Sequence, residues 1–221
     1  MKNQAHYFEI KDIVTQFVAA FNDVVINRYN KDRVSQDQIN VRYVYSPKDR
    51  VLHDLINKSQ HIKLPVVAVS MTSISRDNER VFNKIFGQYE SSTNNIESKH
   101  LPMPIPVNIG INMSIMSRYQ SDVDQIISNF IPYNNPYIVI SWKVPSELST
   151  TLTEIRSEVL WSGDLSLSYP NELQPNQPTR VSADTAFTIK GWIFPGKAVQ
   201  PSKNILHINT NFTPVSGFEY I

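Results

Sequence analysis

The sequence predicts an α/β (α+β) fold, in which a mainly antiparallel sheet of five or six strands carries two or three flanking helices. The segment from Val107 to Ile115 alternates strictly between apolar and polar residues, which indicates a strand with one buried face. Helical periodicity marks residues 7–26 and 121–131, and strand-like runs occupy much of the remaining chain. With 221 residues, of which 41% are hydrophobic, we expect one domain over residues 1–195.

The first expected element is an amphipathic helix from Tyr7 to about Ile26, because apolar residues recur there at intervals of three and four. Residues 27–38 are polar and lead into an alternating strand at 39–45. Serine followed by proline at 46–47 is typical of a helix start, so a short second helix is expected there. A second strand is expected at 65–75.

A third helix is expected directly after the strand at 107–115. Ser121, with Asp124 three positions on, resembles a capping pair, and Pro132 is expected to end the helix. A tight turn at Ser162 and Gly163 is expected between two of the later strands. These later strands are expected at 137–144, 153–161, 164–169 and 180–194.

Two segments lack any periodicity. Residues 87–106 are expected to form an irregular loop, because Pro102, Pro104 and Pro106 each remove a backbone donor. Residues 196–221 are expected to form an irregular carboxyl-terminal tail. This tail keeps enough apolar residues to pack on its own subunit or to act as an arm that reaches a neighbouring one.

The composition excludes several classes of function. There is no cysteine, which excludes disulfides, thiolate metal sites, iron–sulfur clusters and cysteine nucleophiles. The six glycines are too scattered for a phosphate-binding loop, and the five histidines lack the spacing of a helical metal site. We therefore expect no catalytic residue, no cofactor and no metal, and we do not expect an enzyme.

The net charge and the hydropathy of the sequence indicate whether nucleic acid or a membrane is an expected partner. A formal net charge of +1 is far from the basic excess of a protein that binds mainly phosphates. Basic residues at 28–50 interleave with tyrosines, as in a single-stranded nucleic-acid site, but aspartates dilute them and a solvated surface is the preferred interpretation. No secretory signal and no membrane-spanning run is recognisable, so we expect a soluble, intracellular protein without membrane contact.

The stretch from Pro102 to Pro136 resembles the tail sheath stabiliser and completion (neck) protein of T4-like contractile-tailed bacteriophages. The resemblance is carried by a strand that ends in Met-Ser-Ile-Met-Ser-Arg-Tyr at 113–119, an acidic helix start at Asp122 and Ile-Pro-Tyr at 131–133. A second similar stretch, Phe-Thr-Ile-Lys-Gly-Trp-Ile-Phe-Pro at 187–195, resembles the last strand of that family.

The resemblance implies a structural virion protein with a tail-terminator-like fold, located in the tail and neck and assembled in the host cytoplasm. It implies a homo-oligomeric ring that caps the head-proximal end of the tail. We expect this ring to contain six copies. The implied partners are the tail sheath protein, the tail tube terminator and the neck or head-completion proteins, with DNA only as cargo that passes through the ring. The nearest alternative is a tail-tube terminator ring, and a less favoured one is a nucleic-acid-binding protein that uses residues 28–50.

Interface anchors are expected at two places. Arg118 and Tyr119 belong to residue types enriched at interface hot spots, although Arg118 could instead pair with Asp122 one turn on. Gly191 would allow two backbones to approach closely, and Trp192 would supply a large contact area at an interface. Alternatively, Trp192 is a core residue. The candidate interface or structural anchors are Arg118, Tyr119, Asp122, Gly191, Trp192, Phe194 and Pro195.

Overall fold

The structure is a computed structural model that describes residues 6–57, 64–81, 87–91, 97–149, 152–169, 180–196 and 201–203. Its helices are α1 Glu9–Phe21, α2 Lys48–Asn57 and α3 Gln120–Tyr133. Its strands are β1 Val25–Tyr29, β2 Ser35–Asn40, β3 Arg42–Tyr45, β4 Val66–Arg76, β5 Gly87–Ser91, β6 Glu97–Pro102, β7 Ile105–Ser117, β8 Ile138–Lys143, β9 Glu154–Ser168, β10 Val181–Ile193 and β11 Pro201–Lys203.

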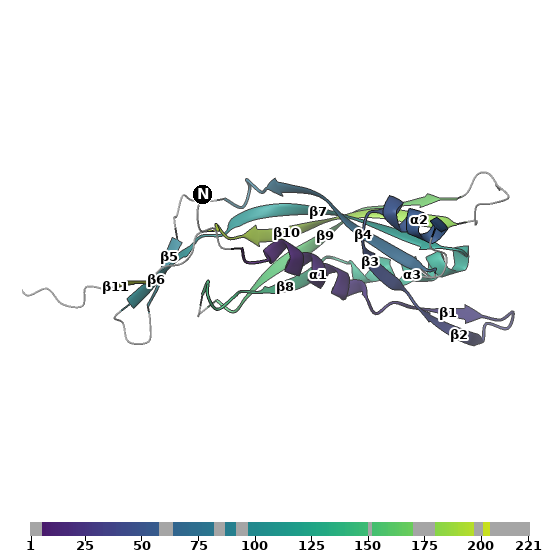
Figure 1. The fold of residues 1–221 in the computed structure, drawn as a ribbon. Coiled ribbons are helices and arrows are strands. Elements are labelled where there is room, and N and C mark those ends of the chain that lie inside the picture. Colours follow the sequence, from purple (N-terminus) through teal and green to yellow (C-terminus); the bar gives the residue numbers. More distant parts are fainter. Residues whose placement is uncertain are drawn as a thin grey trace, which may run out of the picture.

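A six-stranded sheet in the order β3-β4-β7-β10-β9-β8 forms the body of the molecule (Figure 1). All neighbouring strands are antiparallel except β3 and β4, which are parallel. The predicted fold class is therefore confirmed. The alternation predicted at 107–115 is confirmed as well, because all five apolar residues of that stretch are buried on one face of β7.

The main core lies between the sheet and two helices. Helices α1 and α3 bury Phe17, Phe21 and Phe130 against Phe187 of β10, where the four rings meet at centroid distances of 5.1–5.7 Å. A smaller cluster on the opposite face of the sheet is covered by α2, through Val51. Both faces of the sheet are thus covered, but the second only in part.

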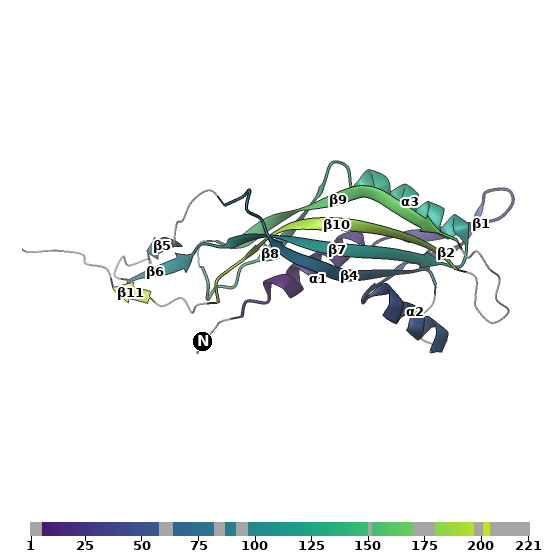
Figure 2. The ribbon, with the colours of Figure 1, turned by 90° about the horizontal axis from the view of Figure 1, so that it is seen from above.

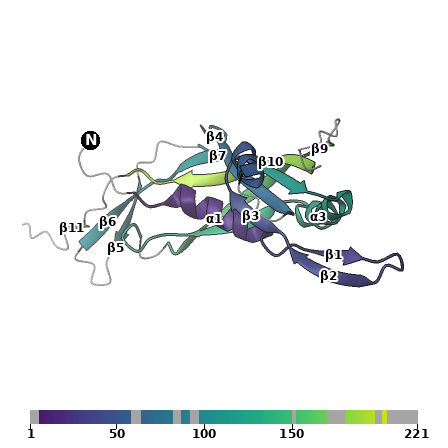
Figure 3. The same ribbon diagram turned by 45° about the vertical axis from the view of Figure 1, so that its right-hand side comes forward.

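Two small sheets extend the molecule in opposite directions. The hairpin of β1 and β2 projects from one end, and the three-stranded sheet β11-β6-β5 lies beyond the other end of the body (Figures 1 and 2). Figure 3 shows the hairpin reaching past the six-stranded sheet near α3. A two-stranded hairpin on its own is marginally stable in water, so contacts at its base must hold it in place.

The first predicted helix is correct in type but too long. Helix α1 ends at Phe21 with Asn22 as its C-cap, and β1 begins at Val25, whereas helix was expected to about Ile26. The apolar residues at 24–26 follow the helical period by coincidence, since Ile26 is buried from a strand. The polar residues 27–38, for which no element was expected, form most of the hairpin.

The tight turn expected at Ser162 and Gly163 is wrong. Strand β9 runs unbroken through this point, and its register with β10 shifts between Thr185 and Phe187. Gly163 has a φ of 83°, a left-handed conformation that glycine adopts without strain. The Thr185 hydroxyl donates to the Asp164 carbonyl at 2.7 Å, so the irregularity is a stabilised bulge within one strand.

The start and end of α3 also differ from the prediction. The N-cap is Tyr119, without a side-chain capping bond, so the expected pair of Ser121 and Asp124 does not cap the helix. The Asp124 carboxylate instead accepts a hydrogen bond from the side-chain Nε2 of Gln120 at 2.7 Å. Pro132 lies inside the last turn, and the helix ends one residue after it.

The expectation of an irregular loop at 87–106 is wrong. Strand β5, at 87–91, pairs in antiparallel register with residues 98–102 of β6, and β7 already begins at Ile105. The spacing of the prolines hid this, because Pro102 ends β6 and Pro106 pairs with Trp192 near the start of β7. The tail is not irregular at 201–203, where β11 pairs with β6, and residues 204–221 lie outside the described residues.

Candidate assembly interfaces

The candidate anchors fall into two groups at opposite ends of the sheet. In the β7–β10 pair, Ser117 lies opposite Val181 and Ile105 lies opposite Ile193. Residues 118–122 therefore follow one end of this pair, and residues 191–195 lie at the other. Thirteen strand residues span about 40 Å, so the two groups do not form one site.

The first group forms a corner where β7 meets α3. Arg118 and Tyr119 are both exposed, and the Arg118 guanidinium lies 5.7 Å from the Tyr119 ring centroid. Asp122 is buried and accepts a hydrogen bond from the Ser117 hydroxyl at 2.9 Å. The cation near Asp122 is Arg28, whose guanidinium lies 4.0 Å from the carboxylate, and not Arg118.

The projecting hairpin is attached to this same corner. The Gln125 side chain of α3 accepts a hydrogen bond from the backbone N–H of Asn27 and donates one to the backbone carbonyl of Asn27, both at 2.9 Å. Arg28 lies over the Tyr119 ring at 5.1 Å. The Tyr119 ring therefore has two guanidinium groups close to it, while the residue remains 46% exposed for a further contact.

The tip of the hairpin carries apolar side chains into solvent. Tyr29 and Val34 are 54% and 59% exposed at the two sides of the turn. The Asn30 side chain accepts hydrogen bonds from the amides of Asp32 and Val34, and Arg33 takes a positive φ of 59°. These turn residues between two strand-capable runs are the signal by which the hairpin could have been found from the sequence.

At the other end of the sheet, Gly191 belongs to the core. A Cβ atom at this position would lie 3.3 Å from Ile109, 3.5 Å from Val107 and 3.6 Å from Ile13 of α1. The close approach at Gly191 is therefore to side chains of β7 and α1 within the same chain. Trp192, on the opposite face, is half-buried beneath the Arg80 guanidinium, which lies 4.9 Å from the ring.

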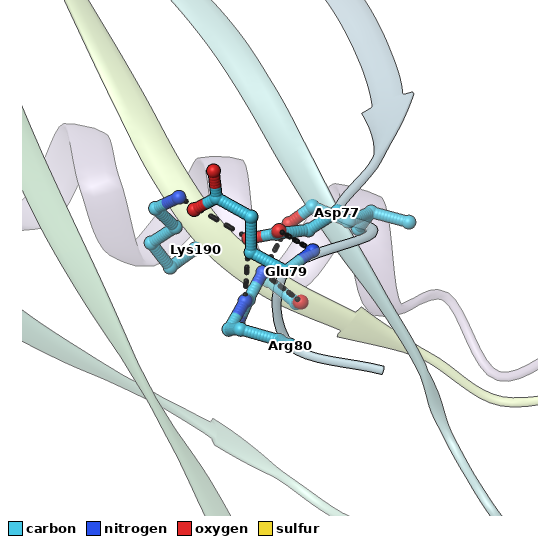
Figure 4. Close-up of polar contacts among 6 residues, drawn as sticks. Asp77, Glu79, Arg80 and Lys190 are labelled. Carbon is cyan, nitrogen blue, oxygen red and sulfur yellow. Dashed lines mark hydrogen bonds and ion pairs between the residues drawn. The ribbon is translucent and has the colours of Figure 1, made fainter. Parts of the chain in front are cut away.

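Asp77 organises a cluster of charged side chains with Arg80 and Lys190 (Figure 4). Its carboxylate accepts hydrogen bonds from Arg80 Nε at 2.7 Å and Lys190 Nζ at 3.2 Å. Arg80 also donates to the carbonyls of Val107 and Gly191, at 2.9 and 3.3 Å. The cluster thereby fastens the loop after β4 to β7 and β10, and no pattern in the sequence predicted it.

The Arg80 hydrogen bond is the largest cause that lowers the pKa of Asp77, from 3.8 to about 2. Burial acts in the opposite direction, and the bonds from Lys190 and the Glu79 amide lower the pKa further. Because the folded-state pKa lies below the unfolded-state value, the carboxylate stabilises the fold above about pH 4. That contribution is lost as the pH falls from about 4 toward 2.

We expect Asp77→Asn to reduce the acid sensitivity of the fold while lowering stability at neutral pH. Urea unfolding at a series of pH values measures this, with the exposed Asp32→Asn as a matched control. The free energy of unfolding should fall less between pH 5 and 2 in Asp77→Asn than in the wild type or the control. Parallel pH profiles for all three proteins would contradict the role given to Asp77.

Phe194 and Pro195 directly follow the end of β10. Phe194 is buried against Trp142, with ring centroids 5.9 Å apart. Its backbone amide donates to the buried Glu9 carboxylate at 3.3 Å, and Pro195 is half-buried. Phe194 therefore contacts both β8, through Trp142, and α1, through Glu9.

The face of the sheet opposite α1 carries a polar groove of about 970 Å³ beside α2. Lys48 donates to Asp184 at 2.6 Å, and Ser114 donates to the same carboxylate at 2.5 Å. This pairing uses one of the basic residues at 28–50, and that segment is divided between the hairpin, β3 and α2. The basic residues considered for nucleic acid therefore come from three different elements.

The part of the chain that the structure describes contains no group of three or more His, Asp or Glu side chains that could hold a metal ion. None of its helices is long and apolar enough to cross a membrane.

Exposed aromatic and apolar side chains on projecting elements are typical of a structural protein that assembles through its surfaces. The comparison with protein families agrees with this class. The model of the T4-like virus Myoviridae tail sheath stabiliser matches residues 6–217, so the chain belongs to that family. The resemblance seen in the sequence is confirmed, and the protein has a structural role in a phage tail.

The sheath/tube terminator of an extracellular contractile injection system, PVC, in its extended state, is a similar solved structure. It is 11% identical in sequence, with a TM-score of 0.36. The similarity covers 97% of this chain and 66% of that one. No curated protein matches the chain.

Proposed function

We propose that six copies of this chain form a ring that caps and stabilises the head-proximal end of a contractile tail sheath and tube. The ring also offers the surface to which the head and neck attach. The observation that carries this proposal is the family match over residues 6–217. The same match favours a role without catalysis, in which DNA passes through the ring as cargo.

The physical task of such a ring is to stabilise one of two states. An extended sheath contacts the ring and a contracted sheath does not, so each contact shifts the equilibrium toward extension. Interfaces of ordinary size, about 1,600 Å² each, are sufficient when they are repeated around a ring. The exposed corner at Tyr119 and the hairpin tip at Tyr29 and Val34 are the surfaces we assign to such contacts.

The proposal is tested by the mass and the partners of the purified protein. Mass photometry should find a particle of about six times the 25.3 kDa subunit, in solution or on isolated tails. The protein should co-sediment with assembled sheath. Co-sedimentation with tube alone would favour the tube terminator, and a monomer that binds neither assembly would refute the proposal.

A nucleic-acid-binding protein would behave differently in the same preparation. Its affinity for DNA would fall steeply as salt rises, because bound phosphates release counterions. We expect no retention of DNA at low salt.

A further inference from the structure

The outer half of β4 is a free sheet edge in the part of the chain that the structure describes. Strand β3 pairs with β4 only over Val66–Val69. Strand β7 pairs with the other side of β4 as far as Arg76. Residues 70–76 therefore present backbone donors and acceptors on their outer side, with a bulge near Thr72 and Ser73–Arg76 in regular register.

This edge lies on an incompletely covered apolar face. Met71 and Ile74 pair with Ile111 and Ile109, so their side chains share the face of the sheet that α1 covers. They nevertheless remain 37% and 41% exposed. On the same side, a groove of about 650 Å³ runs between α1 and β3, lined among others by Ile10, Val14, Val18 and Tyr45.

The sequence beyond β11 contains a segment of matching character. From residue 206 to residue 212 the chain reads Leu-His-Ile-Asn-Thr-Asn-Phe, in which Leu206, Ile208 and Phe212 alternate with polar residues. This period of two is typical of a strand with one apolar face. Seven residues in a strand span about 20 Å, which equals the length of the free edge at 70–76.

The direction of β11 indicates that this segment meets another copy of the chain. Strand β6 runs toward β7, and β11 is antiparallel to β6, so β11 runs away from the body (Figures 1 and 2). Its last residue, Lys203, pairs with Glu97, which is the β6 residue farthest along the chain from β7. Residue 206 follows Lys203 by three positions in the sequence, and an extended chain of three residues spans about 10 Å.

We propose that residues 206–212 of one copy add as a strand to the free edge of β4 in a neighbouring copy. Leu206, Ile208 and Phe212 then cover the apolar face between β4 and α1, while backbone hydrogen bonds pair with residues 73–76. The contact is head to tail, so its repetition closes a ring when the rotation between copies is suitable. This inference rests on the proposed ring and specifies how its subunits are joined.

The absence of native cysteine makes the contact testable by site-specific cross-linking. In the added-strand arrangement, Ile74 and Ile208 both lie on the apolar face. Successive strand residues alternate between faces, so Ser75 and Asn209 both lie on the opposite face. The full-length variant Ser75→Cys/Asn209→Cys, treated with a short bismaleimide, should give a ladder of covalent multimers on a denaturing gel. The matched control is Val139→Cys/Asn209→Cys, which places the first thiol on β8, at the opposite edge of the sheet.

The control and both single-cysteine proteins should give no ladder. Adding Ile208→Asp to the double variant should abolish the ladder, and Ile208→Leu should preserve it. A ladder with the β8 control but not with Ser75 would overturn the inference, as would cross-linking within one chain, detected by mass spectrometry. A six-copy particle without any ladder refutes the inference alone, whereas a protein that is monomeric throughout contradicts the ring as well.

Discussion

Phe187→Ala is expected to lower the free energy of unfolding by about 3–5 kcal/mol, because it removes the centre of the aromatic core. Phe187 is 2% exposed, and its ring lies 5.2 Å from Phe17 and 5.6 Å from both Phe21 and Phe130. These three rings come from α1 and α3, so one truncation weakens the attachment of both helices. With a typical total stability of about 5–15 kcal/mol, the variant is expected to be partly unfolded at moderate temperature.

Urea unfolding followed by circular dichroism measures this loss. Leu167→Ala is a suitable control, because Leu167 is 44% exposed and its truncation should change the free energy by about 0.5 kcal/mol or less. Phe187→Leu should lie between the two, since it keeps most of the buried apolar volume. A loss below about 1 kcal/mol for Phe187→Ala would show that the core is organised around other residues.

Truncation after Pro195 is expected to convert the ring into single subunits, because the carboxyl-terminal arm is the proposed link between copies. A second truncation after Lys203 keeps β11 and removes only the segment proposed to reach the neighbour. Both should behave alike in light scattering, with a mass near that of one shortened subunit. An unchanged mass for the first truncation would refute the assignment of the arm.

Folding of the truncated proteins must be checked separately. Phe194 is packed on Trp142 and bonded to Glu9, so a chain that ends at Pro195 keeps the last core contact of β10. Its thermal unfolding should therefore remain cooperative. Loss of the cooperative transition in the first truncation alone would show that β11 and the β5–β6 sheet stabilise the body, and the second truncation then becomes the valid test.

The elements best predicted from the sequence are those whose own side chains enter the core. β7 shows this most clearly, because a shift of one residue would exchange its buried isoleucines for Asn108 and Asn112. Helix α1 was recognised by the same reasoning from its stripe at Ile13, Val14 and Phe17. Its end was misplaced because a strand begins within the same apolar run.

The errors occur where pairing partners come from distant parts of the chain. The bulge in β9 depends on Thr185, which bonds across the sheet to a residue 21 positions away. The β5–β6 hairpin is extended by β11, from a segment about a hundred residues later. Neither arrangement leaves a local periodicity, so the local sequence predicts a turn in one case and a loop in the other.

The candidate anchors were only partly predictable for the same reason. Tyr119 was chosen for its residue type, and the structure adds its two guanidinium neighbours. The cluster of Asp77, Arg80 and Lys190 was missed, because Lys190 lies 113 positions from Asp77. The roles of all seven anchors in an interface remain predictions.

The sequence by itself determined the fold class, the buried face of β7 and membership of the tail sheath stabiliser family, since these depend on local periodicity and on motifs contiguous in the chain. Only the tertiary structure decided which edge of β4 is free of other described strands, where the hairpin is attached and in which direction β11 runs. These features depend on the relative positions of distant segments, which are set by packing the whole sheet and are not encoded in any one of them.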